Sequence, residues 1–224
     1  MQSTTSEPLV SISWGRTQDR LLGTSLIVAA VALVIAGVLH PEDSPVGMVM
    51  PIWGPLHTVL FLALFVALVG VIRVYAVASS QSTWLGLVAF TLFALGIVGF
   101  EGVMLLEAAV LPVLAGSDAT RALTEEAGAL MTGPLGTWLP FIAIAFSVGA
   151  ITFGLILLRA KDFPRWAGPL LMAAPLFAFE PPIPLWLAKA GVVVFSVGLI
   201  GLGWSIRKLP EQPSTTISAS SSHS

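Results

Sequence analysis

The sequence predicts an all-α membrane protein with six transmembrane helices. Three observations support this: 56% of the 224 residues are hydrophobic and only 10% are charged, the apolar residues form long runs, and tryptophans lie at the ends of these runs. About 20 apolar residues in a helix cross a hydrocarbon core of about 30 Å. Tryptophan favours the headgroup zone because its ring is apolar and its N–H needs a partner. The pattern indicates a multi-pass protein of the cell (inner) membrane, surrounded by the lipid bilayer.

Short polar segments separate the six predicted spans. The first span has no small-x-small cleavage site, so we interpret it as an uncleaved helix rather than a signal peptide. The fifth contains Pro169 and Pro175 and should be kinked or tilted, because proline removes a backbone donor. The predicted spans cover residues 21–39, 55–77, 84–107, 138–158, 166–181 and 185–206.

Basic residues predict the orientation, since cytoplasmic loops are enriched in Lys and Arg. With a cytoplasmic N-terminus, eight of the ten Lys and Arg fall inside, and only Arg121 and Lys189 fall outside. We therefore expect the N- and C-termini to be cytoplasmic. The segment at about 116–137 would then be an outer loop, containing either a short surface helix over 118–130 or flexible chain.

The chain divides into three regions by composition. Residues 1–20 form a polar N-terminal segment, and residues 21–206 form the six-helix transmembrane domain. Residues 207–224 form a tail rich in Ser after Leu209, with no apolar period, which predicts disorder.

The second, fourth and sixth spans share the pattern Val-Gly-x-Ile, which begins at Val69, Val148 and Val197. Glycine at such positions lets two helix backbones approach closely, which drives helix packing in lipid. The recurrence favours three parallel helical-hairpin repeats. The alternative is chance, because Val, Gly and Ile are common in any membrane helix.

Composition and motifs exclude several functional classes. The chain has no cysteine, so it has no disulfide, thiolate metal ligand or thiol nucleophile. Its net charge of −2 argues against a nucleic-acid partner. It contains no His-Glu-x-x-His helix and no phosphate loop. We therefore predict no catalytic residue and no metal site, and the sequence leaves any cofactor undefined.

Ionisable side chains inside membrane spans are costly and mark candidate functional sites. Glu101 lies 17 residues beyond Trp84, which places it about 25 Å further along the helix and just beneath the outer boundary. Four such side chains fall at a similar depth on different helices: His57, Glu101, Glu180 and Lys189. By contrast, we interpret His40 as the end of the first span, and Glu107 as lying near the headgroups.

These four side chains support two interpretations. They form one outward-facing polar pocket that binds or transports a small ligand. Alternatively, each extends separately to the headgroups, and the protein is a structural or accessory subunit that packs against a membrane protein partner and binds no ligand. The direction of the helix faces distinguishes the two: Glu101, His57 and Lys189 face the bundle interior in the first and the lipid in the second.

Overall fold

A computed structural model describes residues 15–78, 84–125, 127–178 and 183–210, and these residues form helices, turns and loops without any strand. Five of the helices are long and apolar enough to cross a membrane. They have 23 to 26 residues each, which corresponds to about 35 Å or more. They are α1 (Arg16–Leu39), α3 (Trp53–Ala78), α4 (Trp84–Ala109), α7 (Pro134–Leu157) and α10 (Leu185–Arg207). The prediction of an all-α, multi-pass membrane protein is confirmed.

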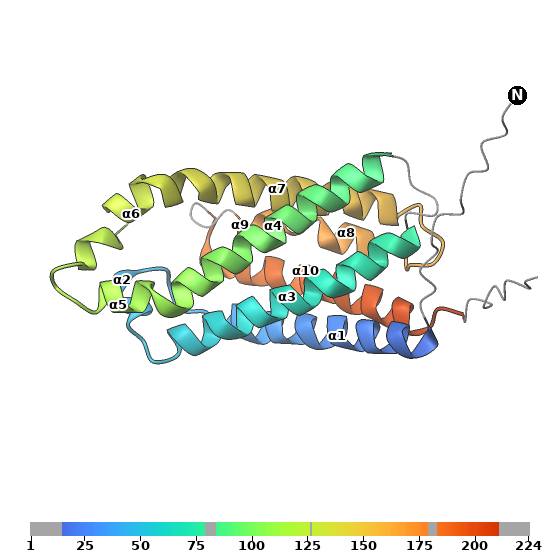
Figure 1. The fold of residues 1–224 in the computed structure, drawn as a ribbon, viewed down its shortest axis with the longest axis horizontal. Helices are drawn as coiled ribbons and strands as arrows, with labels where there is room; N and C mark the ends of the chain where they lie inside the picture. Colours follow the sequence, from blue (N-terminus) through green and yellow to red (C-terminus); the bar gives the residue numbers. More distant parts are fainter. Residues whose placement is uncertain (1–14, 79–83, 126, 179–182, 211–224) are drawn as a thin grey trace, which may run out of the picture.

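The long helices follow one another around a closed ring (Figure 1). Helix α1 packs against α3, α3 against α4, and α4 against α7. Two short helices, α8 (Ala167–Leu171) and α9 (Pro175–Ala178), pack against both α7 and α10. Helix α10 in turn packs extensively against α1. The order of the helices in the chain is therefore their order around the ring, and the first and last helices are neighbours.

The expected fifth span at 166–181 is a shorter apolar segment, Ala167–Ala178, that is interrupted rather than continuous. The segment is broken between α8 and α9, where the N–H of Ala174 bonds the carbonyl of Leu171 in a turn at 3.2 Å. Pro175 follows this turn and has no N–H to continue a helix from Leu171. We had expected proline only to bend the helix. The end of the predicted span, residues 179–182, lies outside the described part of the chain.

Phenylalanine rings fill the interior of the ring of helices. The ring of Phe146 on α7 lies 5.4 Å from Phe93 on α4 and 5.7 Å from Phe195 on α10, measured between centroids. Phe177 on α9 completes the group, 5.3 Å from Phe195. Aromatic rings at these separations attract one another beyond their burial of area. The middle of the bundle is therefore a packed core.

The three recurrent glycines lie against neighbouring helices. A Cβ on Gly149 would lie 2.2 Å from the backbone nitrogen of Phe93 on α4. A Cβ on Gly70 would lie 2.9 Å from Leu26 on α1, and one on Gly198 would lie 3.1 Å from a backbone oxygen in α8. In each case the glycine faces the membrane-embedded helix that precedes it in the chain.

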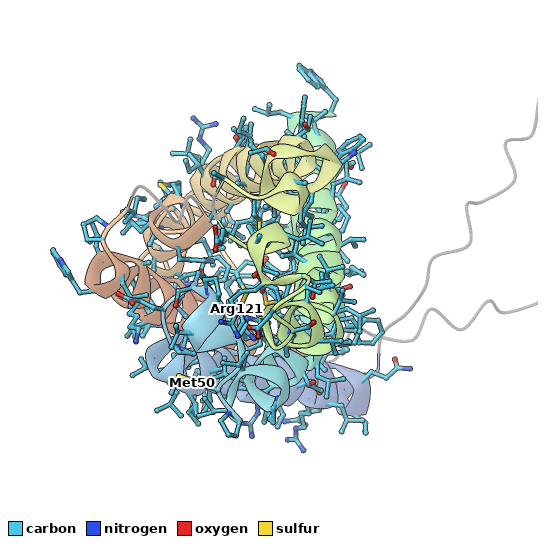
Figure 2. The ribbon with its side chains drawn as sticks, turned by 90° about the vertical axis from the view of Figure 1, so that its left-hand side faces the viewer. Met50 and Arg121 are labelled. Atoms are coloured by element: carbon cyan, nitrogen blue, oxygen red, sulfur yellow. The ribbon has the colours of Figure 1, made fainter. Side chains whose placement is uncertain are left out.

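Helix α1 begins and α10 ends at one end of the bundle, which we name the terminal end. The opposite, distal end carries the short elements α2 (Pro45–Met48), α5 (Leu111–Ala115), a 3₁₀ turn (Arg121–Leu123) and α6 (Ala129–Thr132). Figure 2 views the molecule from this end, with Met50 and Arg121 over the ring. Residues 118–130 do not form a continuous surface helix. Instead, the short elements pack over the distal end through an apolar cluster of Met48, Trp53, Leu111 and Ala115.

Candidate functional site at the distal end

His57 lies in the first turns of α3 and points into the bundle, where its side chain has no exposed surface. Trp53, one turn earlier on the same face, is also completely buried, with its ring centroid 4.4 Å from that of His57. The indole Nε1 of Trp53 donates to the carbonyl oxygen of Glu107 on α4 at 2.9 Å. The N–H of Trp53 is therefore satisfied inside the protein.

His57 is the centre of a hydrogen-bonded group that we name the histidine cluster: His40, His57 and Glu107. The Nε2 atoms of His40 and His57 lie 3.0 Å apart. The Nε2 of His57 also lies 3.0 Å from Oε2 of Glu107. The three residues come from the end of α1, from α3 and from α4, so the cluster ties three successive helices together at the distal end.

His40 was predicted to end the first span and Glu107 to lie near the headgroups, and neither was predicted to be part of the site. His40 does follow directly after α1, which ends at Leu39. Its ring nevertheless turns inward and lies 5.3 Å from the ring of Trp53. One signal in the sequence could have found the site: Trp53 and His57 are four residues apart, so they share one helix face, and a buried Trp would have carried the His inward.

Burial lowers the pKa of His40 from its ordinary value of 6.5, and the adjacent His57 lowers it further. The carbonyl of Pro41 and the carboxylate of Glu107 raise the pKa in part, and Lys189 lowers it by the smallest contribution. His40 is therefore held towards its neutral form, in which one ring nitrogen accepts a hydrogen bond.

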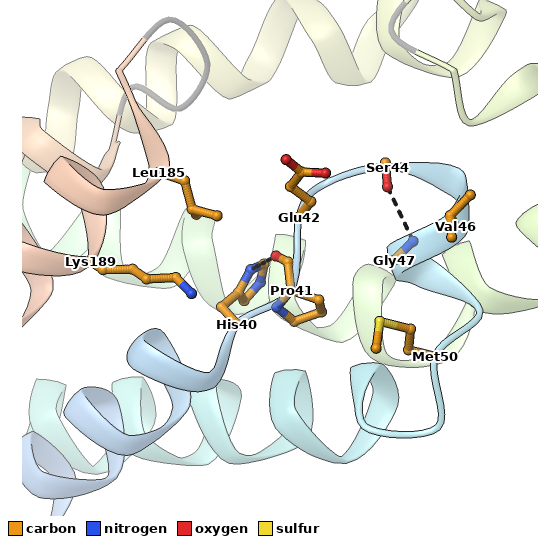
Figure 3. Close-up of a pocket in the computed structure, with 9 residues that line it drawn as sticks. All are labelled: His40, Pro41, Glu42, Ser44, Val46, Gly47, Met50, Leu185 and Lys189. Carbon is orange, nitrogen blue, oxygen red and sulfur yellow. Dashed lines mark hydrogen bonds between the residues drawn. The ribbon is translucent and has the colours of Figure 1, made fainter.

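An open hollow of about 660 Å³ adjoins the histidine cluster. Figure 3 shows that the side chain of Lys189, from α10, and the ring of His40 lie next to each other on its wall. Glu42 and Ser44 add polar groups from the loop after α1. We name this the distal hollow, and its lining residues are His40, Pro41, Glu42, Ser44, Val46, Gly47, Met50, Leu185 and Lys189.

The structure brings together some of the predicted site residues. Lys189 lines the distal hollow and donates from Nζ to the carbonyl oxygen of Val38 at 2.9 Å. His57 lies behind the wall of the hollow and is joined to it through His40. Two of the four predicted residues, His57 and Lys189, therefore meet at the same end of the bundle through a third residue that was not predicted.

Glu101 does not join this group. It lies on α4 about one and a half turns before Glu107, and its Oε1 is buried without a hydrogen-bond partner among the described residues. The neighbouring Gly102 has no atom within 4 Å of the place where a Cβ would be. The remaining predicted residue, Glu180, lies outside the described residues.

A buried ion pair lies near the terminal end, between α1 and α3. Nε of Arg73 lies 2.6 Å from Oδ1 of Asp19, and its terminal nitrogen donates to Oδ2 at 3.0 Å. Each residue is only 4% exposed. Asp19 falls within the segment 1–20 that was predicted to be a polar N-terminal region, whereas α1 begins at Arg16 and carries Asp19 into the helix packing.

The fold defines a multi-pass membrane protein with a polar cluster and an open hollow at one end. The chain matches no known protein family, and no curated protein or solved structure is significantly similar to it. In the part of the chain that the structure describes, no three His, Asp or Glu side chains are grouped so as to hold a metal ion.

Proposed function

We propose that the protein binds a small polar ligand in the distal hollow, with Lys189 as the principal recognition group. The observation that carries this proposal is the joint presence of Lys189 and His40 on the wall of one hollow, although they come from opposite ends of the sequence. Pockets of 300 to 1,000 Å³ with mostly apolar walls and a few polar groups are typical of small-molecule sites.

The wall chemistry suggests the class of ligand. An ammonium group has three donor hydrogens, and the Nζ of Lys189 uses one of them on the carbonyl of Val38. The other hydrogens are available to an anionic group on the ligand. Glu42 lines the same hollow with an acceptor carboxylate, and Val46 and Leu185 supply apolar surface. These groups favour a small molecule with an acidic group and a separate hydrogen-bond donor.

We propose further that the distal end faces the outside of the cell membrane and that the chain crosses the membrane six times, with α8 and α9 together forming the fifth crossing. The distribution of basic residues supports this orientation. The packing of α8 and α9 between α7 and α10 supports their assignment as the fifth crossing. The positions of Gly70, Gly149 and Gly198, each facing the preceding membrane-embedded helix, support an arrangement of three hairpin repeats.

The absence of native cysteine makes the orientation directly testable. A single cysteine introduced at Ser44, in the distal loop, should react with a membrane-impermeant maleimide in intact cells. A single cysteine at Lys161, in the loop at the terminal end, should react only after the membrane is opened. The reverse pattern would place the distal hollow in the cytoplasm.

The ligand proposal is tested on protein extracted from its native membrane in mild detergent. Native mass spectrometry should find a small molecule bound in stoichiometric amount to the wild type and lost from Lys189→Ala. Lys161→Ala is the matched control, because Lys161 is also an exposed basic residue but lies at the terminal end, and it should retain the molecule. An empty wild-type protein, or equal loss from both variants, would contradict ligand binding in the hollow.

The accessory-subunit function remains the second candidate, and Glu101 is the observation that favours it. The side chain of Glu101 is partly exposed, and the position of a Cβ on the neighbouring Gly102 is open, so a helix of another protein would find room to pack on this face of α4 beside a polar group. Co-purification of one defined polypeptide with the wild type, and its loss from Glu101→Leu, would support this candidate. Unchanged recovery of that polypeptide with the variant would remove the support.

A further inference from the structure

The Nδ1 atoms of His40 and His57 each lie within hydrogen-bonding distance of a backbone carbonyl oxygen. Nδ1 of His40 lies 2.7 Å from the oxygen of Pro41, and Nδ1 of His57 lies 2.9 Å from the oxygen of Trp53. A carbonyl oxygen can only accept a hydrogen bond. Each Nδ1 therefore carries a hydrogen, which fixes the tautomer that each ring would have if it were neutral.

The two Nε2 atoms then determine how many protons the cluster holds. If both rings were neutral, each Nε2 would present a lone pair to the other at 3.0 Å. A hydrogen bond at this distance requires one additional proton, which makes one of the two rings an imidazolium. His57 is the ring that carries it, because its single Nε2–H is then shared between two acceptors at 3.0 Å, Nε2 of His40 and Oε2 of Glu107, and the carboxylate balances the positive charge.

The charged groups around the cluster agree with this assignment. Lys189, from α10, acts against a positive charge on His40. In the loop after α1, Asp43 has Oδ1 3.9 Å from Nδ1 of His40, and Glu42 lines the adjoining hollow. From α4, Glu107 reaches only His57 with a hydrogen bond. The additional proton is thus favoured on the inner ring, beside Glu107, and disfavoured on the outer ring, beside Lys189.

We propose that His40, His57 and Glu107 form a site that binds a single proton, and that this proton holds the His40 ring in the wall of the distal hollow. The site does not depend on whether the hollow binds a ligand. When the proton leaves, two lone pairs face each other beside a carboxylate. His57 has no exposed surface and cannot move away, whereas the His40 side chain is 16% exposed and turns towards the hollow.

The same geometry gives the route of the proton. His57 has no contact with solvent, so a proton reaches its Nε2 only through a neighbour. His40 and Glu107 retain 16% and 19% exposure and both touch that atom. The cluster therefore exchanges its proton with the distal side and is closed towards the middle of the bundle.

Nitrogen-15 NMR on the full-length protein in lipid nanodiscs tests the proposal. The chain has three histidines, so His223→Ala leaves only the two rings of the cluster. At neutral pH we expect a nitrogen–nitrogen coupling across the Nε2–Nε2 hydrogen bond, with both Nδ1 atoms protonated. Raising the pH should abolish the coupling in one step that involves both rings. Absence of the coupling, together with two rings that titrate independently, would overturn the proposal.

A pair of carboxylate variants tests the role of Glu107. Glu107→Gln removes the balancing charge, so the pH at which the coupling disappears should fall by at least one unit. Glu101→Gln, on the same helix but outside the cluster, is the matched control and should leave that pH unchanged. Equal behaviour of the two variants would show that Glu107 does not hold the proton in place. If Glu107→Gln does not fold, the wild-type coupling and its pH dependence still decide the proposal.

Discussion

The two ends of the bundle fasten their helices with different chemistry. Near the terminal end, Arg73 on α3 and Asp19 on α1 form a buried ion pair with two short contacts. At the distal end, His40 follows α1, and its contact with His57 on α3 depends on a proton that can leave. The same two helices are thus held by a permanent charge pair at one end and by a titratable pair at the other.

This difference teaches which end of the molecule can respond to its surroundings. Arginine stays charged at every pH that a protein experiences, so the terminal end is fixed. Histidine changes charge near neutrality, and here the histidines adjoin the hollow. Any conformational response to pH or to a ligand should therefore begin at the distal end, with the terminal end acting as the fixed point.

The largest expected effect comes from breaking the fixed end. Arg73→Ala leaves the carboxylate of Asp19 buried without its partner, and we expect the free energy of unfolding to fall by about 3–5 kcal/mol. Reversible unfolding in mixed micelles measures this change. The double variant Asp19→Leu with Arg73→Met is the control, and it should recover most of the stability because no charge remains buried. A single variant as stable as the wild type would show that the pair fastens nothing.

The next effect is a pH dependence that belongs to the distal end. Because the pKa of His40 lies below 6.5 in the folded protein, the unfolded chain takes up a proton first as the pH falls. The free energy of unfolding should therefore decrease as the pH falls below about 6.5, the pKa of histidine in the unfolded chain, by about 1.4 kcal/mol for each unit of pKa difference. The loss is complete below the folded pKa of His40. Unfolding curves of the wild type and His40→Gln at each pH check this.

His40→Gln should remove the decrease in the free energy of unfolding that His40 causes at acidic pH. Arg73→Ala should lower the profile of stability against pH without changing its shape between pH 7 and 5.5, because neither member of the ion pair titrates there in the unfolded chain. If the two variants changed the profile in the same way, the contrast between a fixed and a titratable end would be lost.

The smallest expected effect separates a hydrogen bond that does not titrate, that of Trp53, from the titratable histidines at the same end of the bundle. Trp53→Phe keeps the buried ring beside His57 but removes the donor to the carbonyl of Glu107. We expect a loss of about 1 kcal/mol, the usual contribution of one neutral hydrogen bond. The loss should be the same at pH 5.5 and pH 7.5, because the indole does not titrate. A pH-dependent loss would mean that Trp53 also orients His57.

Hydropathy predicted the long helices well because the membrane requires a minimum length of apolar chain. The third span was expected at 84–107 and is α4, Trp84–Ala109, and the sixth was expected at 185–206 and is α10, Leu185–Arg207. The interruption of the fifth segment could not be predicted, for a physical reason. Apolar composition is the same for a continuous helix and for two short ones, and the effect of Pro175 on the backbone depends on how neighbouring helices cover the broken turn.

The candidate site was only partly predictable because depth along a helix can be counted, whereas the direction of a side chain around it cannot be read from a nearly uniform apolar sequence. Depth placed His57 and Lys189 near one end. It could not show that Trp53 and His57 face inward, or that Glu107 contacts the histidine cluster whereas Glu101 does not. His40 was missed because a residue before proline at a helix end has no helical face at all.

The closure of the ring by α1 and α10 also constrains how the protein is made. The two helices approach so closely that a Cβ on Gly23 would lie 2.4 Å from the carbonyl oxygen of Gly203. As the ribosome delivers the chain, α1 enters the bilayer first, but the face that carries Gly23 stays uncovered until the last helix is synthesised. A nascent chain stopped before residue 185 would leave this seam open to lipid and to membrane proteases. Closure of the ring thus requires synthesis and insertion of the chain through α10.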